Sequence, residues 1–270
     1  MAVFYDTHAH LDYPDYAADI VDVIERAKTA GITKIISIGT DLASSRRAIQ
    51  LAERFENVFA VVGWHPSNAD EAPEDIRAEL RELARHPKVV ALGETGFDYH
   101  RLPSGKPEFT AADDARYKQK QAAIFQQHLE VAAEVGLNCV IHQRGDALAD
   151  TLALMQPFIG KVRGVFHCFS SDVAAMQKIL ATGSIVSFTG IATFKNGQNV
   201  RDVIAATPLG QFMLETDCPY LAPVPYRGKR CEPAYVKEIS EVVAQVKGCS
   251  LEELSKATCA TAKVFFSKLG

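Results

Sequence analysis

Short runs of β-branched and aromatic residues alternate with longer amphipathic stretches along almost the whole chain. This alternation is typical of βα units, in which each buried strand of a parallel sheet is followed by a helix that covers it. The apolar runs predict eight strands, at Val3–Tyr5, Lys34–Ile38, Val58–Val62, Val89–Leu92, Asn138–Ile141, Val162–Phe166, Ser184–Phe188 and Phe212–Leu214. The pattern therefore predicts an α/β protein.

The amphipathic stretches predict helices between and after these strands. One helix is expected at Tyr16–Ala30, which Gly31 follows, and another at Pro73–Ala84, which begins with a proline. Two more are expected after the eighth strand, at Pro233–Lys247 and Leu251–Leu269. The last one begins with Ser250-x-x-Glu253, the pattern of a capping box.

The chain has 270 residues, enough for two small domains or one large one. No change of composition, flexible linker or long repeat divides it, so we expect a single domain over residues 1–270. Eight strands followed by helices or loops favour a closed TIM (β/α)8 barrel, which takes ~250 residues, over an open doubly wound sheet. With 47% hydrophobic and 23% charged residues, a disordered or collagen-like chain is excluded.

The segment after the fourth predicted strand differs from the other connections. Residues 99–114, from Tyr99 to Asp114, are mostly polar and include two prolines, and the next helical pattern begins near Ala115. Loops of this length in compact domains are usually functional or mobile. We expect this one at the carboxyl ends of the strands.

The charges narrow the possible partners. Twenty-nine Lys and Arg against 33 Asp and Glu give a net charge of −4, which excludes binding to nucleic acid or membrane by overall positive charge but leaves local basic patches open. The first residues have no basic region, and no apolar run reaches the ~18 residues that span a bilayer. A cytoplasmic protein without membrane contact is expected, with its six cysteines reduced because none forms a C-x-x-C pair.

Histidines gather where the predicted strands end. His8 and His10 follow the first strand, His65 the third, His142 the fifth and His167 the sixth. Two carboxylates share this position, Glu94 after the fourth strand and Asp217 after the eighth. In a barrel the carboxyl ends of all strands meet at one mouth, where barrel enzymes keep their active sites. We expect these side chains to lie close together.

Imidazoles and carboxylates without thiolates suit zinc, manganese, iron, cobalt or nickel, with magnesium where oxygen ligands dominate. His8 and His10 are alternate residues of an extended segment, so both rings can reach one ion. Six ligands exceed the need of one ion but suit two ions ~3.5–4 Å apart, with Glu94 as the bridge. The predicted ligands are His8, His10, Glu94, His142, His167 and Asp217. For His65, contact with a substrate phosphate and bracing of the rim remain equal alternatives.

Five motifs together resemble the TatD family of metal-dependent deoxyribonucleases. They are Thr7-His8-Ala9-His10-Leu11-Asp12, Gly93-Glu94-Thr95-Gly96-Phe97-Asp98-Tyr99, Ile141-His142-Gln143-Arg144, Phe166-His167-Cys168-Phe169-Ser170 and the segment Glu215–Pro223. Residues 226–230 also look like the family's basic loop. The resemblance implies a TIM barrel of the amidohydrolase-like superfamily and a divalent-metal-dependent 3′–5′ exonuclease or endonuclease. The sequence departs from the family's usual pattern at Thr95, Phe97, Ser171 and Cys231, and none of these residues is a predicted metal ligand.

The resemblance also implies roles for individual residues. One ion would be held by His8, His10, Glu94 and Asp217, and the other by Glu94, His142 and His167. The resemblance leaves open whether a third ion binds and whether the ions are Mg, Mn or Zn. Asp217 and Glu94 would be the catalytic residues, with Asp217 orienting the attacking water and Glu215 supporting the ligands from behind. Predicted substrate contacts are His65, Arg144, Arg227, Lys229 and Arg230 for phosphates and Tyr99 and Phe169 for bases. Tyr220 and Tyr226 near the same rim are further candidates for base stacking, whereas core packing is favoured for Trp64.

The predicted function is hydrolysis of DNA phosphodiester bonds, in the 3′–5′ direction on single strands or 3′ ends. DNA is the expected partner, RNA is a further candidate substrate, and no obligate protein partner is inferred. The alternative enzyme is a small-molecule amidohydrolase or lactonase on the same barrel. A non-catalytic metal-binding scaffold is disfavoured, because a structural zinc needs only four ligands in a closed site.

Overall fold

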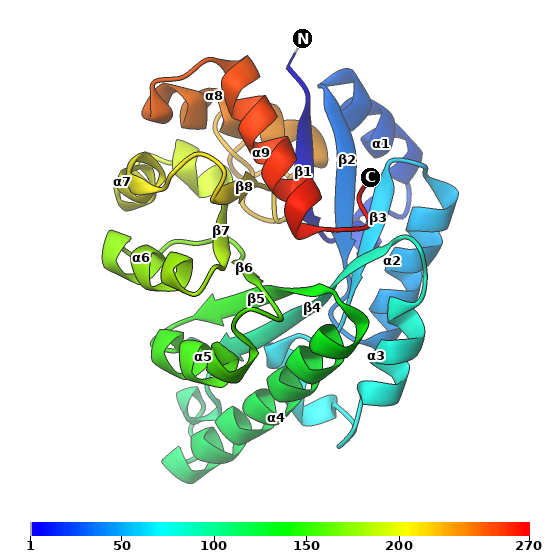
Figure 1. Cartoon of the computed structure of the whole chain (residues 1–270), viewed down its shortest axis with the longest axis vertical. Coiled ribbons are helices and arrows are strands. Elements are labelled where there is room, and N and C mark those ends of the chain that lie inside the picture. The colour runs from blue at the N-terminus through cyan, green and yellow to red at the C-terminus, as the bar shows by residue number, and fades with distance from the viewer. Residues whose placement is uncertain (1) are drawn as a thin grey trace.

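Eight parallel strands form one sheet in the order of the sequence in the computed structural model, which describes residues 2–270 (Figure 1). The strands are β1 Phe4–Ala9, β2 Ile32–Ile38, β3 Val58–Val62, β4 Val89–Asp98, β5 Asn138–Arg144, β6 Gly164–Phe166, β7 Ile185–Phe188 and β8 Phe212–Leu214. Each strand pairs in parallel with the next one along the chain. The number and order of the predicted strands are confirmed.

The two edges of this sheet meet between β1 and the segment after β8. Ala9 pairs with Cys218 in a parallel bridge. The backbone N–H of Asp217 donates to the His8 carbonyl at 2.9 Å, and that of His10 donates to the Cys218 carbonyl at 2.8 Å. These bonds nearly close the sheet into the predicted TIM barrel, and they bring the ligand candidates of the first and last strands together.

Helices surround the strands, as Figure 1 shows. They are α1 Ile20–Thr29, α2 Leu42–Arg54, α3 Arg77–Ala84, α4 Ala111–Val135, α5 Leu148–Met155, α6 Val173–Ala181, α7 Gln198–Ala206, α8 Val236–Lys247 and α9 Leu251–Phe265. One apolar cluster lies between strands and helices, and a second fills the barrel where Phe265, Phe266 and Leu269 pack against inward residues such as Ile36. The C-terminal segment therefore closes one end of the barrel and leaves the other for polar side chains.

Three predicted helix boundaries are wrong, and tertiary contacts explain the differences. The helix expected from Tyr16 begins only at Ile20, because Tyr16 belongs to a separate 3-10 turn, Pro14–Tyr16, and its hydroxyl donates to the distant Cys231 carbonyl at 2.6 Å. The helix expected from Pro73 begins at Arg77. The helix expected to reach Leu269 ends at Phe265, after which the chain turns its apolar residues into the barrel.

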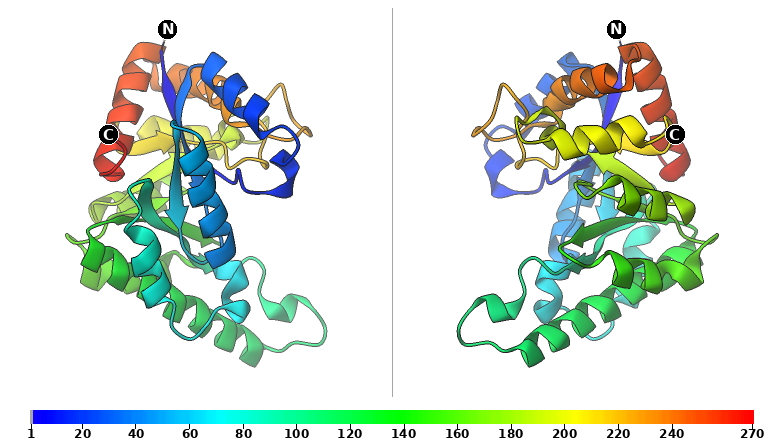
Figure 2. Two further views of the ribbon diagram at one scale, coloured as in Figure 1. Left: turned by 90° about the vertical axis from the view of Figure 1, so that its right-hand side faces the viewer. Right: turned by 90° about the vertical axis from the view of Figure 1, so that its left-hand side faces the viewer.

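The strands at the mouth extend further than predicted. β1, β4 and β5 continue to Ala9, Asp98 and Arg144, so His8, Glu94 and His142 lie within strands rather than after them. The loop after β4 is shorter than predicted because α4 begins at Ala111, where the Asp113 carboxylate accepts bonds from the Thr110 N–H and hydroxyl at 2.8 Å. Figure 2 shows this loop and the start of α4 projecting from the molecule.

Two further expectations concern membrane-spanning helices and the cysteines. No helix within residues 2–270 is long and apolar enough to cross a membrane. All six cysteines are free thiols, as predicted.

Candidate metal centre

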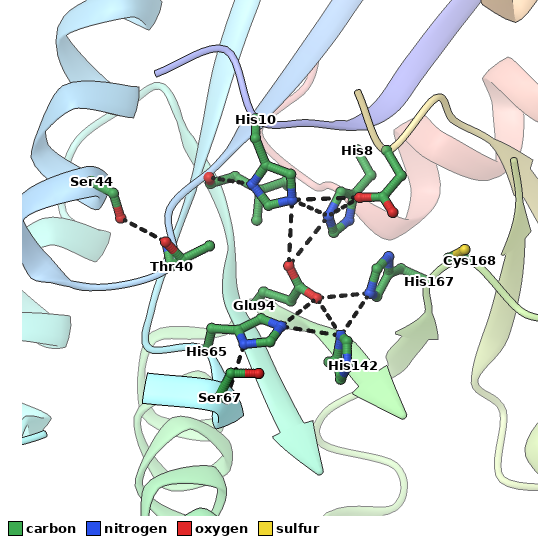
Figure 3. Close-up of polar contacts among 12 residues, drawn as sticks. His8, His10, Thr40, Ser44, His65, Ser67, Glu94, His142, His167 and Cys168 are labelled. Atoms are coloured by element: carbon green, nitrogen blue, oxygen red, sulfur yellow. Dashed lines mark hydrogen bonds and ion pairs between the residues drawn. The ribbon is translucent and has the colours of Figure 1, made fainter. Parts of the chain in front are cut away.

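The Glu94 carboxylate lies at the middle of a cluster of buried histidines in the barrel mouth (Figure 3). Its Oε2 atom lies 3.4 Å from Nε2 of His8 and 3.8 Å from Nε2 of His10. Its Oε1 atom lies 2.7 Å from Nδ1 of His142 and 2.7 Å from Nε2 of His167. The two oxygens of one carboxylate therefore face two different groups of imidazoles.

Asp217 completes the first group. Its Oδ1 atom lies 3.6 Å from Nε2 of His8 and 3.5 Å from Nε2 of His10. Asp217 adopts a left-handed backbone conformation with φ +57°, which is unusual for a residue other than glycine. Its N–H bond to the His8 carbonyl holds that conformation and places the carboxylate beside the two imidazoles.

One hydrogen bond, behind His10, and two nearby carboxylates, behind His142 and His167, lie on the side of these rings away from the centre. Nδ1 of His10 lies 3.3 Å from the Ile38 carbonyl, to which it can only donate, so Nε2 keeps its lone pair for a cation. Nε2 of His142 lies 3.4 Å from Asp98, and Nδ1 of His167 lies 3.7 Å from Glu215. Carboxylates behind ligating imidazoles are a recurrent support of metal sites. Glu215 thus lies where the sequence placed it.

His65 is oriented differently from the other histidines. Its Nδ1 atom accepts a bond from the Ser67 N–H at 3.0 Å, so the neutral ring carries its proton on Nε2. Burial lowers the pKa of His65 and keeps the ring neutral. Nε2 lies 3.3 Å from Glu94 Oε1. His65 is therefore built as a hydrogen-bond donor to the centre rather than as a metal ligand.

A second buried layer holds the strands beneath the cluster, and of its two carboxylates the sequence predicted Glu215 but not Asp6. The Asp6 carboxylate accepts bonds from the Thr216 N–H at 2.9 Å and hydroxyl at 2.6 Å, and from the His8 N–H at 3.3 Å. Glu215 accepts a bond from the Cys168 N–H at 2.6 Å. Each of these carboxylates fixes the backbone next to a candidate ligand. Their only signal in the sequence is an acidic residue in or beside an apolar run.

The local charges keep the two central carboxylates ionised. Burial alone would favour neutral acids, but the positive charge of His167 and the hydrogen bond with His142 hold the pKa of Glu94 well below its usual range. Burial likewise opposes ionisation of Asp217, yet the contacts with His10 and His8 lower its pKa. Burial also opposes a charge on His167, but Glu94 and Glu215 raise its pKa well above the usual value. The carboxylates are therefore ready to bind cations.

The donor set fits divalent cations. Nε2 of His8 and Nε2 of His10 approach to 3.3 Å, and Nδ1 of His142 and Nε2 of His167 to 3.1 Å. Within residues 2–270, Nδ1 of His8 has no hydrogen-bond partner. Lone-pair donors so close together are costly to bury unless a cation or proton lies between them. Three trios have ligand atoms within 4.8 Å of one another: His8, His10 and Asp217; His8, Glu94 and His167; and His65, Glu94 and His142.

A cavity of about 700 Å³ opens above this cluster. The predicted residues that line it are His10, His65, Glu94, His142, Arg144, His167 and Asp217. Nine further residues also line it: Tyr13, Thr40, Ser67, Asn68, Asp98, His100, Arg101, Tyr220 and Leu221. The unusual length of the loop after β4 is the signal that could have identified His100 and Arg101.

Other predicted substrate contacts lie outside this cavity. Arg227 and Lys229 are exposed on the loop after β8, where the Arg227 guanidinium stacks on Phe194 at 3.8 Å. The Arg230 guanidinium donates to Asp19 at 2.7 Å and to Glu232 at 2.8 Å. The Tyr99 hydroxyl donates to Asp150 at 2.8 Å. Phe169 is buried beside a smaller cavity of about 100 Å³ that also borders Arg144 and His167.

Comparisons with known proteins find a matching family and named relatives. The family model described as TatD related DNase matches residues 5–267. An uncharacterized metal-dependent hydrolase, YabD of Bacillus subtilis, is 36% identical over 98% of this chain and 99% of its own length. The 3′-5′ ssDNA/RNA exonuclease TatD of Erwinia amylovora is 32% identical over 97% of this chain and 99% of its own length.

Solved structures resemble the whole fold. YJJV, a TatD homolog from Escherichia coli, superposes with a TM-score of 0.86 at 25% identity over 98% of both chains. An organophosphorus hydrolase variant from Deinococcus radiodurans superposes with a TM-score of 0.65 at 13% identity, over 97% of this chain and 92% of its own. The second likeness extends to the fold alone.

Proposed function

This chain belongs to the TatD-related DNase family of metal-dependent hydrolases, and from this premise we propose that it is a divalent-metal-dependent deoxyribonuclease. The proposed reaction is hydrolysis of DNA phosphodiester bonds in the 3′–5′ direction, on single strands or at 3′ ends, with RNA as a further substrate. The name of the Erwinia amylovora relative supports the nucleic-acid substrate and the direction. The cytoplasmic location stays a prediction from the sequence.

The position of Glu94 is the observation that carries this proposal. Its two oxygens face His8 and His10 on one side and His142 and His167 on the other, as expected of a carboxylate that bridges two ions. The proposed ligands are therefore His8, His10, Glu94 and Asp217 for one ion and Glu94, His142 and His167 for the other. When bound, such ions, whether Mg, Mn or Zn, neutralise a phosphate and lower the pKa of an attacking water.

Asp217 and His65 are the residues of the chain that we assign to the reacting groups. Asp217 lines the cavity, and its lowered pKa keeps it able to accept a proton from the attacking water. The Nε2–H of His65 points at the centre, so it can donate to a phosphate oxygen. This orientation favours the phosphate-contact alternative for His65 over bracing of the rim.

Arg144 is the strongest candidate for a phosphate contact outside the centre. It is half-buried, lines the cavity and forms no salt bridge within residues 2–270, with Sγ of Cys168 at 4.0 Å from its guanidinium. Arg227 and Lys229 are proposed as outer phosphate contacts. The same role for Arg230 would require it to leave Asp19 and Glu232, and base contacts by Tyr99 and Phe169 would require exposure of Phe169.

The direct test uses 3′-labelled single-stranded DNA, double-stranded DNA and RNA, each with and without a chelator. We expect release of the labelled nucleotide from single-stranded DNA, loss of that release with chelator, and recovery after Mg²⁺ or Mn²⁺ is added. The competing amidohydrolase is tested in parallel with lactone and cyclic amide substrates. Hydrolysis of those small molecules without release of nucleotides from any nucleic acid would reject the proposed function.

A further inference from the structure

The cavity above the metal centre has two chemically different walls. Tyr13 follows β1 and Tyr220 follows β8, whereas Arg101 follows β4 and Arg144 ends β5. The sheet runs from β1 to β8 in order and closes between these two strands, so β4 and β5 lie across the mouth from them. Figure 2 shows the loops after β4 and after β8 projecting on the same side of the molecule at opposite ends of that side. An aromatic wall thus faces a cationic one.

The aromatic wall is continuous with the metal centre. The Tyr13 ring stacks on the His10 ring with centroids 4.9 Å apart and planes at 26°. Tyr220 packs edge-on against Tyr13 at 6.2 Å and 83°. Tyr220 nevertheless keeps 54% of its surface exposed, which is unusual for a large aromatic side chain beside a cavity. The exposed ring surface is therefore one tyrosine away from a candidate metal ligand.

The backbone around Tyr220 is held firmly. Asp217 and Leu221 both have left-handed conformations, with φ +57° and +56°, which cost free energy in residues other than glycine. The Tyr220 N–H donates to the Asp217 carbonyl at 3.1 Å. A Cβ atom on Gly190 would lie 2.2 Å from the Leu221 carbonyl oxygen, so the neighbouring segment packs tightly against this turn. The exposure of Tyr220 is a property of a fixed turn.

The opposite wall supplies positive charge without carboxylate partners. Within residues 2–270, neither Arg101 nor Arg144 forms a salt bridge, whereas Arg230 pairs with Asp19 and Glu232. The Asp98 carboxylate, at the end of β4, also lines this side of the cavity, where it lies 3.4 Å from Nε2 of His142. Both arginines line the cavity. A half-buried guanidinium without a partner is costly unless an anion binds it. Arg144 therefore marks a place for an anionic group on the side of the centre away from the tyrosines.

We propose that Tyr13 and Tyr220 form a platform for one unpaired nucleobase of a nucleotide that flanks the scissile phosphate, while Arg144 and Arg101 bind phosphate on the other side. This inference rests on the proposed nuclease function and specifies how the same site selects its substrate. An aromatic face stacks on any base, so the platform is tolerant of sequence. A base inside a duplex is already stacked and paired, so the platform selects single strands and frayed ends.

The experiment compares oligonucleotides that carry all bases with oligonucleotides that lack one base on either side of the scissile phosphate. The ratio of kcat/KM for the intact and abasic substrates is measured for the wild type, Tyr220→Ala and Tyr220→Phe. We expect the wild type to prefer the intact substrate at one of the two positions by about tenfold, the order of one base–aromatic stack. Tyr220→Ala should bring this ratio close to one, and Tyr220→Phe should retain it because the ring remains.

Phe109→Ala is the matched control, since Phe109 is a 40% exposed aromatic that does not line the cavity, and it should keep the wild-type ratio. Equal losses for intact and abasic substrates in Tyr220→Ala at both positions would overturn the platform while leaving the nuclease function intact. Absence of nucleotide release by the wild type would reject the nuclease function instead. In that case the platform is tested by the affinity of the protein for phosphorothioate forms of the same oligonucleotides. Equal affinity for the intact and abasic forms would reject the platform.

Discussion

His128 and the histidines of the metal centre are buried in the same barrel, yet their hydrogen bonding differs completely. His128, on α4, donates from Nδ1 to the Ile124 carbonyl at 2.8 Å and accepts on Nε2 from the Trp64 N–H at 3.0 Å. In the centre, imidazole nitrogens face one another at 3.1–3.3 Å and Nδ1 of His8 has no partner within residues 2–270. A complete hydrogen-bond set identifies a structural histidine, and an incomplete, crowded set identifies a cation site.

The largest expected effect comes from replacing Glu94, the proposed bridging carboxylate among the centre's incompletely hydrogen-bonded histidines. Glu94→Gln keeps the size of the side chain but removes the charge that both groups of histidines face. We expect the metal-dependent kcat/KM on single-stranded DNA to fall by more than about a hundredfold, because even the outer partners of metal ligands are worth ~10–100-fold. The measurement is the rate of nucleotide release with Mg²⁺ or Mn²⁺.

Two controls accompany this variant. Circular dichroism should show an intact fold, because Glu94 lies at the mouth and not in the apolar core. Added metal should raise the melting temperature of the wild type but not that of Glu94→Gln, since only a protein that binds the ion is stabilised by it. Undiminished nuclease activity in Glu94→Gln would contradict the assignment of the bridge.

The fully hydrogen-bonded His128 should make the free energy of unfolding depend on pH. Burial lowers the pKa of His128 to about 4, below the usual ~6.5. The unfolded chain therefore takes up a proton at higher pH than the folded one. The contribution of neutral His128 is fully present above pH ~6.5 and is lost as pH falls towards 4, a total of about 3 kcal/mol in the free energy of unfolding.

His128→Gln tests this contribution, because glutamine does not titrate and can still accept the Trp64 N–H bond. Urea unfolding of both proteins is compared at pH 7 and pH 4.5 with a chelator present, so that metal binding does not contribute. The wild type should lose more stability than the variant on acidification, by most of that 3 kcal/mol. Parallel losses would show that His128 titrates normally and is not held neutral by burial.

The smallest expected effect concerns a group of paired charges on the rim, formed by Asp19, Arg26, Arg230 and Glu232. Asp19→Asn removes one carboxylate from Arg26 and Arg230. We expect only a small fall in the free energy of unfolding, because solvent and salt screen ion pairs on the surface. The variant leaves the Arg230 guanidinium with Glu232 as its carboxylate partner and removes one negative charge from the rim, so KM for DNA at low salt should not rise. A raised KM would show that DNA binding needs the paired arrangement.

Much of the fold follows from the sequence alone. Apolar periodicity located all eight strands, and Ser250-x-x-Glu253 located the start of α9, because these signals are carried by residues close together in the chain. Helix starts at Ile20 and Arg77 were missed because they involve contacts with distant residues: the Tyr16 hydroxyl donates to the Cys231 carbonyl at 2.6 Å, and Gln127 accepts the Ile76 N–H bond at 2.8 Å.

The centre divides in the same way. The sequence by itself determined which residues could ligate, because His8, Glu94, His142, His167 and Asp217 each belong to a local strand-end motif. Only the tertiary structure decided how they are supported: Asp6 meets Thr216, Tyr13 meets Tyr220, and His128 meets Trp64. Most of these contacts join residues about 200 positions apart, and no local pattern encodes them. The contacts of Asp6 with Thr216 and of Tyr13 with Tyr220 exist because closure between β1 and the segment after β8 places these distant segments side by side, whereas α4 brings His128 to Trp64.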